Sequence, residues 1–326
     1  MHLVLDECEG IKCLKNQNGN CFVQDAADFL LAEEDCGGMQ TEVCEGNIIS
    51  ATLGEVQVGQ VMEDEMGQYI NMSGTFPRMK WNRGQNEMSW EAQFALRKGE
   101  KGVRLKITLD WHGEATRIRL RIPGCMPGRD VFYEVPFGGV RREAYKNLPT
   151  ARGEWPAHRF TAIESGSKGI ALLNKGVAGV EQEGNALTTT MIRAYGDCDL
   201  AWVKPSDASS QCGKSTFEFM LVPYMCSYKE NNIVQLAQEF NQPVKAWNGR
   251  SSLDITAESY FVVDQANIVL SSIKNAWDES GDLIIRFYET EGRETTGQFY
   301  LKGLKEVYSS DVTEAQGVKL ANAGSI

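Results

Sequence analysis

Histidine is scarce in this chain, with only three residues, at positions 2, 112 and 158, and no H-x-D or H-E-x-x-H spacing. A catalytic metal site needs several converging ligands, and histidines a few residues apart are its usual signature. The P-loop pattern, a dinucleotide fingerprint and the G-x-S-x-G nucleophile elbow are also missing. We therefore expect neither catalytic residues nor a metal site in this chain.

Long apolar runs and an excess of positive charge are absent as well. No stretch approaches the roughly 20 uncharged apolar residues of a membrane helix, and residues 1–9 are too acidic for a signal peptide. The 44 acidic residues outnumber the 33 basic ones, and the net charge of -11 repels nucleic acid and anionic membranes. These absences predict a cytoplasmic protein with no nucleic-acid or membrane partner.

The nine cysteines include no C-x-x-C pair, which leaves a structural zinc site unsupported. Five of them lie between positions 8 and 44, a density that a disulfide-bonded secreted protein would also show. A chain of 326 residues buries enough core to fold without disulfide staples. We therefore favour free thiols in a reducing compartment.

Most of the chain shows a period of two, with apolar and polar residues alternating over five to nine positions. This pattern buries one face of a strand and exposes the other. Turn signals such as Asn18-Gly19 and Glu291-Gly292 separate the segments, which favours consecutive antiparallel strands and a sandwich over βαβ units. The clearest strands are predicted at residues 103–111, 116–122, 217–222 and 283–289.

One segment has helical spacing instead, residues 229–240, and Pro243 should stop it. A polar stretch at 248–252 follows, and then a second series of strands. We therefore expect three parts, which are a large β domain at 1–228, a helical linker at 229–250 and a smaller β domain at 251–326.

Candidate binding residues concentrate at 131–158, where aromatic and charged side chains alternate in a segment rich in Gly and Pro. A sugar site uses this mixture, because aromatic faces cover the C–H faces of a pyranose while charged groups hydrogen-bond its hydroxyls. An interdomain loop, with packed aromatics and paired arginines, is the other interpretation. The candidates are Arg141, Arg142, Tyr145, Glu154, Trp155 and His158. The run Glu33-Glu34-Asp35, by contrast, is typical of a solvated face.

This segment also carries a family resemblance. Residues 133–142 (YEVPFGGVRR), 154–160 (EWPAHRF) and 169–174 (GIALLN) resemble motifs of glycoside hydrolase family 38, the α-mannosidases, in the family's order. Residues 110–112 (DWH) and 285–289 (IRFYE) are similar to two further family segments. Together the matches extend over about residues 47–314 and make the resemblance fairly specific.

The resemblance implies an all-β fold, a galactose-mutarotase-like supersandwich followed by a smaller β-sandwich. It also implies that the zinc and the aspartate nucleophile belong to an N-terminal barrel without a counterpart here, so this chain is expected to hold no cofactor. Residues 213–217 lack the family's histidine, and the family's last strand has no match after residue 314. The smaller domain is therefore expected to be truncated.

The leading hypothesis is the C-terminal region of an α-mannosidase-like glycoside hydrolase with a role in mannose metabolism. It would support its own N-terminal catalytic domain, contribute to binding α-mannosides or related glycans, and be inactive by itself. The alternative is a free-standing carbohydrate-binding module. A third possibility, an epimerase or lyase, would depend on His158 and Glu154 converging.

Overall fold

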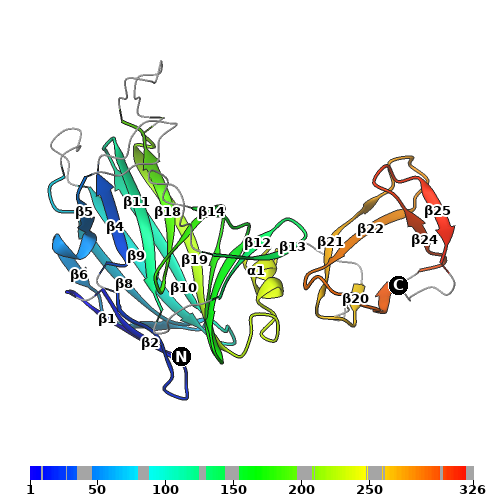
Figure 1. Cartoon of the computed structure of the whole chain (residues 1–326), viewed down its shortest axis with the longest axis horizontal. Helices are drawn as coiled ribbons and strands as arrows, with labels where there is room; N and C mark the ends of the chain where they lie inside the picture. The colour runs from blue at the N-terminus through cyan, green and yellow to red at the C-terminus, as the bar shows by residue number, and fades with distance from the viewer. Residues whose placement is uncertain are drawn as a thin grey trace. The chain divides into compact units, whose positions relative to one another are not determined.

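The computed structural model describes most of the chain, and the chain packs as two compact units (Figure 1). The first unit comprises Met1–Val135 and Val140–Asn241, and the second comprises Pro136–Gly139 and Gln242–Ile326. Each unit is described by itself below. The described residues are 1–8, 10–26, 28–34, 46–79, 88–124, 130–143, 154–196, 208, 210–246, 248, 259, 261–301 and 304–320.

The larger sheet of the first unit has ten antiparallel strands in the order β13-β12-β15-β16-β19-β10-β9-β8-β6, with β7 pairing with β8. Its strands are β6 (Val56–Val58), β7 (Met62–Asp64), β8 (Gly67–Thr75), β9 (Ser89–Arg97), β10 (Val103–Trp111), β12 (Asp130–Val135), β13 (Gly138–Arg142), β15 (Phe160–Ser165), β16 (Lys168–Asn174) and β19 (Gly213–Met225).

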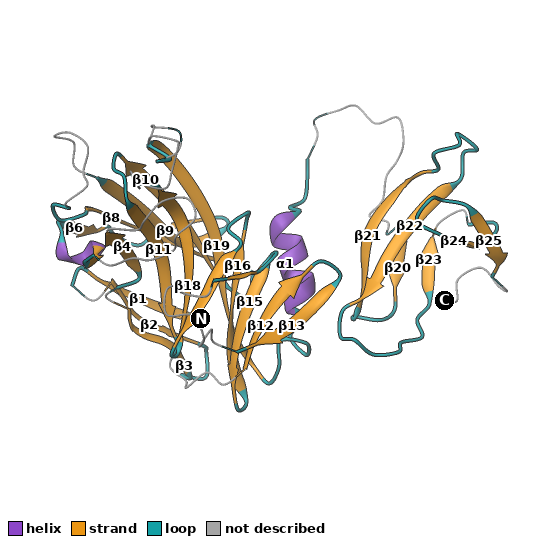
Figure 2. Cartoon of the chain, turned by 45° about the horizontal axis from the view of Figure 1, so that its top comes forward, coloured by secondary structure: helices purple, strands orange, loops and turns teal. Residues whose placement is uncertain are grey.

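A six-stranded sheet lies against it, in the order β14-β17-β18-β11-β4-β5 (Figures 1 and 2). Its strands are β4 (Leu30–Glu34), β5 (Ile48–Ser50), β11 (Thr116–Pro123), β14 (Trp155–Pro156), β17 (Gly179–Glu183) and β18 (Ala186–Ala194). A short helix, η1 (Ala51–Leu53), follows β5. A third sheet of β1 (His2–Asp6), β2 (Gly10–Lys15) and β3 (Cys21–Ala26) adds side chains to the same core.

The core lies between the two large sheets and follows from the alternating pattern. Along β10, every second residue from Val103 to Trp111 is at most 1% exposed. On the facing sheet, Ile118, Leu120 and Ile122 of β11 join the same apolar cluster. Burial of such side chains contributes about 1.5–3 kcal/mol each, so this layer holds the sandwich together. The predicted all-β sandwich fold is confirmed.

Helix α1 (Ile233–Asn241) packs on the outer face of the larger sheet. Ile233, Ala237 and Phe240 are buried on one side of the helix and contact a second apolar cluster that includes Phe160 and Met220. The Asn241 side chain ends the helix by donating to the carbonyl of Ala237. The helix therefore belongs with the packing of the first unit. The domain boundaries predicted at 228/229 and 250/251 stay predictions, because residues 249–258 lie outside the described residues.

The second unit is a smaller β structure built of three two-stranded pairs. Phe261, Phe287 and Phe299 form its aromatic centre, with ring centroids 5.8 and 6.5 Å from that of Phe299. Its strands are β20 (Phe261–Val263), β21 (Ile268–Asn275), β22 (Leu283–Glu289), β23 (Phe299–Leu301), β24 (Tyr308–Ser310) and β25 (Gln316–Lys319). In the described parts of both units, no helix has the length and apolarity needed to cross a membrane.

Candidate functional site: a buried arginine–carboxylate cluster

Three arginines occupy alternate positions on β11. Arg117, Arg119 and Arg121 alternate with the core residues of the strand, so they all project from the face that points away from the core. Such a face usually meets water. Here Arg119 is 0% exposed and Arg117 is 3% exposed. A fully buried charge is stable only when it is paired and hydrogen-bonded, so this face requires partners.

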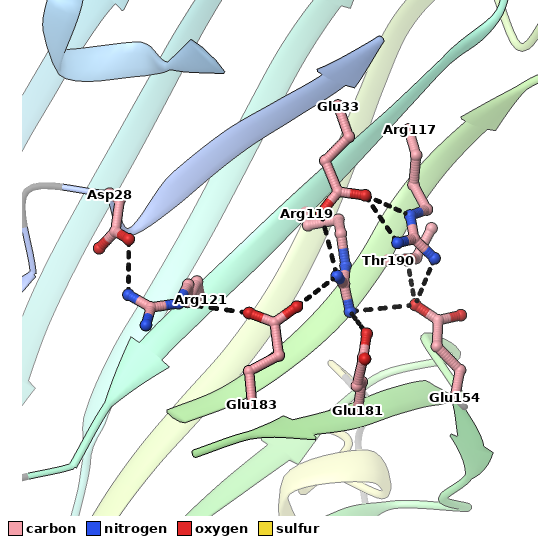
Figure 3. A network of polar contacts seen from close by, with 9 residues as sticks. All are labelled: Asp28, Glu33, Arg117, Arg119, Arg121, Glu154, Glu181, Glu183 and Thr190. Carbon is pink, nitrogen blue, oxygen red and sulfur yellow. Dashed lines mark hydrogen bonds and ion pairs between the residues drawn. The ribbon is translucent and has the colours of Figure 1, made fainter. Parts of the chain in front are cut away.

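The partners are acidic residues that neighbouring strands bring to the same face (Figure 3). Glu33 on β4 lies directly opposite Arg117 in the strand register. Glu181 and Glu183 come from β17, and Glu154 precedes β14. We call the whole set the arginine–carboxylate cluster. Its members are Asp28, Glu33, Arg117, Arg119, Arg121, Glu154, Glu181, Glu183 and Thr190.

Arg119 is the centre of the cluster. Its Nη1 donates to Glu33 Oε1 at 3.1 Å and to Glu183 Oε1 at 2.9 Å. Its Nη2 donates to Glu181 Oε2 at 2.7 Å and lies 3.4 Å from Glu154 Oε1. One guanidinium therefore joins carboxylates from three separate segments of the chain. Its Nε, also buried, has no hydrogen-bond partner among the described residues.

Glu33 ties the second arginine into the cluster. Its Oε2 accepts from Nε of Arg117 at 2.9 Å and from Nη2 at 2.6 Å, which is a charge-assisted pair with little solvent screening. Glu154 lies 3.6 Å from Arg117 and also accepts a hydrogen bond from the hydroxyl of Thr190 on β18. The outermost pair, Arg121 with Asp28 at 2.6 Å, is partly exposed. Exposure thus rises from the centre of the cluster to its edge.

Gly179 makes room for Glu154. A Cβ atom at this position would lie 2.7 Å from Glu154 Oε2, so the carboxylate would have to shift. The glycine of β17 is therefore part of what lets the Glu154 carboxylate reach the arginines.

The electrostatic environment differs between the carboxylates. Burial alone raises the pKa of Glu33, but the adjacent Arg117 and Arg119 outweigh burial and bring the pKa below its ordinary value. For Glu181, burial is the larger effect and its pKa is raised despite the contact with Arg119. The cluster contains five acids and three arginines, so the acids are in excess. Glu33 is thus held as a carboxylate, whereas Glu181 binds a proton more readily than a solvated glutamate.

An aromatic stack adjoins the cluster. The Arg142 guanidinium lies 4.7 Å from the Trp155 ring and 5.6 Å from the Tyr133 ring, and it donates to the Pro156 carbonyl at 3.3 Å. Burial raises the pKa of Tyr133 to about 12, with Arg142 opposing the shift and Glu181 adding to it. Glu181 therefore links the stack electrostatically to the cluster.

Family models match both units. The C-terminal domain of glycosyl hydrolases family 38 matches residues 60–199, and the C-terminal beta sandwich domain of the same family matches residues 267–324. The chain belongs to glycosyl hydrolase family 38. Residues 60–199 of this family 38 region include β11, β14, β17 and β18, which carry most of the cluster. The predicted family is confirmed.

Curated relatives share part of this family 38 region. Human alpha-mannosidase 2C1 is 28% identical over 194 residues, which are 58% of this chain and 18% of the relative. An alpha-mannosidase of Saccharomyces cerevisiae is 22% identical over 202 residues, which are 57% of this chain and 18% of the relative. The matched part is therefore less than a fifth of either relative.

Two solved structures from Enterococcus faecalis share the fold. An alpha-mannosidase of strain V583 has a TM-score of 0.84 with 13% identity, over 99% of this chain and 40% of that chain. A glycosyl hydrolase family 38 protein has a TM-score of 0.82 with 13% identity, over 99% of this chain and 41% of that chain. At this identity the likeness shows the architecture of the family 38 region and not its activity.

The predicted binding residues fall into different environments in this family 38 region. Arg142 and Trp155 stack on one another, and Glu154 joins the cluster. Arg141 is exposed and pairs with Asp130, and no hydrogen bond or ion pair connects it with the cluster in the described part. His158 is exposed, and its backbone N–H donates to the Glu134 carbonyl at 2.8 Å. Tyr145 lies outside the described residues.

The sequence analysis missed the centre of the cluster. The interpretation of Glu33-Glu34-Asp35 as a solvated run was wrong for its first two members, because Glu33 is 1% and Glu34 is 2% exposed. Residues 116–122 (TRIRLRI) did place three arginines on one strand face. An arginine at every second position of an otherwise apolar strand was the available signal, since a face so dense in positive charge requires nearby acids.

The family 38 resemblance implies a zinc ion, which needs several His, Cys, Asp or Glu ligands around one point. No group of three His, Cys, Asp or Glu side chains among the described residues has the arrangement of a metal site. His112 instead pairs with Asp110 at 2.7 Å. The acids at the centre of the cluster have arginine partners. These residues do not fit a zinc site.

Proposed function

We propose that this chain is the C-terminal region of an α-mannosidase-like glycoside hydrolase, in which it supports a catalytic barrel and contributes to carbohydrate binding. The order of the two family models and the α-mannosidase names of the relatives support this proposal. The zinc and the nucleophile would then belong to the barrel, outside the residues of this chain. The barrel and α-mannosides or related glycans are its proposed partners.

One observation carries the proposed contribution to carbohydrate binding: the buried cluster holds β14 in place from both sides. Glu154 precedes this strand and contacts Arg117 and Arg119, while Trp155 within it stacks under Arg142. A binding surface works best when its side chains are held rigidly before the ligand arrives. The β14 edge therefore presents a fixed carboxylate beside an aromatic–guanidinium stack, which is the chemistry that recognises sugar hydroxyls and C–H faces.

Two buried polar atoms add to this argument. Arg119 Nε and Thr188 Oγ1 have no hydrogen-bond partner among the described residues, although both residues are 0% exposed. A buried polar atom without a partner costs about 1–3 kcal/mol. A water molecule or a ligand hydroxyl that reached either atom would recover this energy, which favours a polar ligand near the cluster.

We also propose that the protein works in the cytoplasm. Among the described cysteines, Cys8, Cys13 and Cys226 are free thiols, as suits a reducing compartment.

We expect this chain by itself to show no turnover of an aryl α-mannoside, with or without added zinc. The proposal places the nucleophile on the barrel, and no group of described residues has the arrangement of a metal site. Release of the aryl alcohol measures this directly, and a complete family 38 α-mannosidase under the same conditions is the positive control. Turnover that copurifies with the chain would contradict the assignment of catalysis to a separate barrel.

Arg142→Met in the complete enzyme is expected to raise KM for an α-mannoside about tenfold, or ~1.4 kcal/mol in binding. Methionine keeps an apolar side chain over the ring of Trp155 but removes the guanidinium. The matched control is Arg97→Met, at an exposed position on β9, which lies in the same sheet as β13 but several strands away from it. Equal KM values for the two variants, with similar melting temperatures, would show that the β14 edge does not contribute to sugar binding.

A further inference from the structure

A tryptophan of the second unit is almost fully exposed. Trp277 has 87% of its surface accessible, and it lies in the loop of residues 276–282 that joins β21 to β22. Tryptophan gains more from burial than most side chains, so an exposed ring on a soluble domain is a common sign of a binding surface. In the described residues, no cation or aromatic ring stacks on it.

The backbone under this ring is fixed. The N–H of Ala276 donates to the carbonyl of Asp282 at 2.9 Å, and the Asp278 carboxylate accepts from the N–H of Ser280 at 3.0 Å. The N–H of Trp277 itself donates to Glu314 Oε2 at 2.9 Å. The loop backbone is therefore held by hydrogen bonds, while the ring remains accessible to a ligand. A loop that is already ordered loses less entropy when a ligand binds.

Glu314 connects this loop to a second one. Its Oε1 pairs with Lys274 at 2.5 Å and with Arg286 at 3.1 Å, so the residue is anchored to both β21 and β22. In the same loop, Asp311 Oδ1 accepts from the N–H of Thr313 at 2.8 Å and from that of Ala315 at 3.1 Å. We call residues 276–282 and 311–315 together the Trp277 platform.

The polar groups of the platform suit hydroxyls. Glu279 and Asp282 are exposed in the same loop as Trp277, and their carboxylates make no hydrogen bond or ion pair with any described residue. They can therefore accept hydrogen bonds from a ligand lying on the indole ring. Their charge repels anionic ligands, which favours a neutral polyhydroxyl compound.

A protein partner fits this surface less well. Stable protein interfaces bury about 800 Å² on each side around an apolar centre that is depleted in charge. Here the exposed apolar side chains, such as Val312 at 91% and Leu283 at 48%, are accompanied by the carboxylates of Asp278, Glu279 and Asp282. The mixture of one flat ring and several acceptors is the chemistry of a sugar platform.

We propose that the Trp277 platform is a non-catalytic binding site for a neutral glycan, separate from the β14 edge. Trp277 stacks on a sugar face, and Glu279 and Asp282 accept hydrogen bonds from its hydroxyls. The assignment of α-linked mannose to this glycan rests on the proposed function. The position of the site is argued only from residues of the second unit.

The test uses the complete 326-residue chain and linear α-mannotriose, with binding followed by calorimetry and by protection of tryptophan fluorescence from acrylamide. We expect binding in the range of about 0.1–10 mM. Trp277→Ala should weaken it at least tenfold, and the double variant Glu279→Gln with Asp282→Asn should weaken it severalfold. Arg97→Met, at an exposed position on β9 of the first unit, should leave it unchanged.

The outcomes separate this site from the proposed function. Binding that Trp277→Ala abolishes and Arg97→Met does not alter supports the platform, whatever Arg142→Met does to the KM of the complete enzyme. Binding that Trp277→Ala leaves intact, or the absence of binding to α-mannotriose and to a β-linked glucotriose, overturns it. A change in sedimentation of Trp277→Ala without any sugar response also overturns it, because it assigns Trp277 to self-association. Since the ring is exposed, the variant should fold, and its melting temperature checks this.

Discussion

Replacing Arg119 with alanine is expected to lower the free energy of unfolding of the first unit by about 3–5 kcal/mol. The guanidinium is 0% exposed and holds Glu33, Glu181 and Glu183 by hydrogen bonds. Without it these carboxylates face one another in a poorly solvated layer, and the void left by the side chain adds to the loss. Urea unfolding at neutral pH, followed by circular dichroism, measures the change.

The same substitution at Arg121 provides the matched control. This arginine is on the same strand and the same face, but its side chain is 22% exposed and that of its partner Asp28 is 39% exposed. An ion pair so close to water contributes about 0–1 kcal/mol, so Arg121→Ala should be nearly neutral. If both variants lose the same stability, the effect belongs to the strand in general and the buried network has no special role.

Replacing Glu33 with glutamine should lower stability at pH 7 by about 1.5–3 kcal/mol, because the charge-assisted bonds to Arg117 and Arg119 are weakened. The pKa of Glu33 is lowered in the folded state, so the stability from this carboxylate is fully present above its ordinary value of 4.5. It is lost as pH falls through the lower, folded-state pKa. The difference between Glu33→Gln and the unmodified chain should therefore disappear in acid.

Glu181→Gln should behave in the opposite way. The pKa of Glu181 is raised, so ionisation of this group opposes folding above its folded-state pKa, and this penalty fades as pH falls toward 4.5. The neutral variant should thus match or exceed the unmodified chain in stability at pH 7 and converge with it in acid. Denaturation curves at several pH values test both substitutions, from pH 7 to about 4.5 for Glu181 and from about 4.5 downward for Glu33. A pH trend of the same sign in both would contradict the assigned environments.

Much of the fold could be predicted from local patterns. The alternation at 103–111 became β10, the segment 283–289 became β22, and the helical spacing at 229–240 corresponds to α1. These predictions succeeded because the spacing of apolar residues can be read from a short stretch of sequence. A strand or helix with one buried face requires apolar residues at that spacing. The family motifs succeeded for the same reason, since they are short and continuous.

The candidate site was only partly predictable. Glu154, Trp155 and Arg142 were chosen because their chemistry suits a sugar, but the sequence offered no reason to connect them with Arg119. The cluster is assembled by strands that pair across long stretches of chain, β4 with β11 and β11 with β18. Strand order depends on the packing of the entire sheet, and a charged position next to an apolar one is normally assigned to water.

The sequence by itself determined which residues of each strand share a face, that the chain is all-β, and that it carries family 38 motifs, because all three depend on residue type and spacing. The tertiary structure alone decided that the polar face of β11 is buried, that five acids meet three arginines there, and that Trp277 is left exposed on a braced loop. The physical reason is that burial and ion pairing depend on tertiary contacts between segments distant in sequence. Local periodicity carries no information about these contacts.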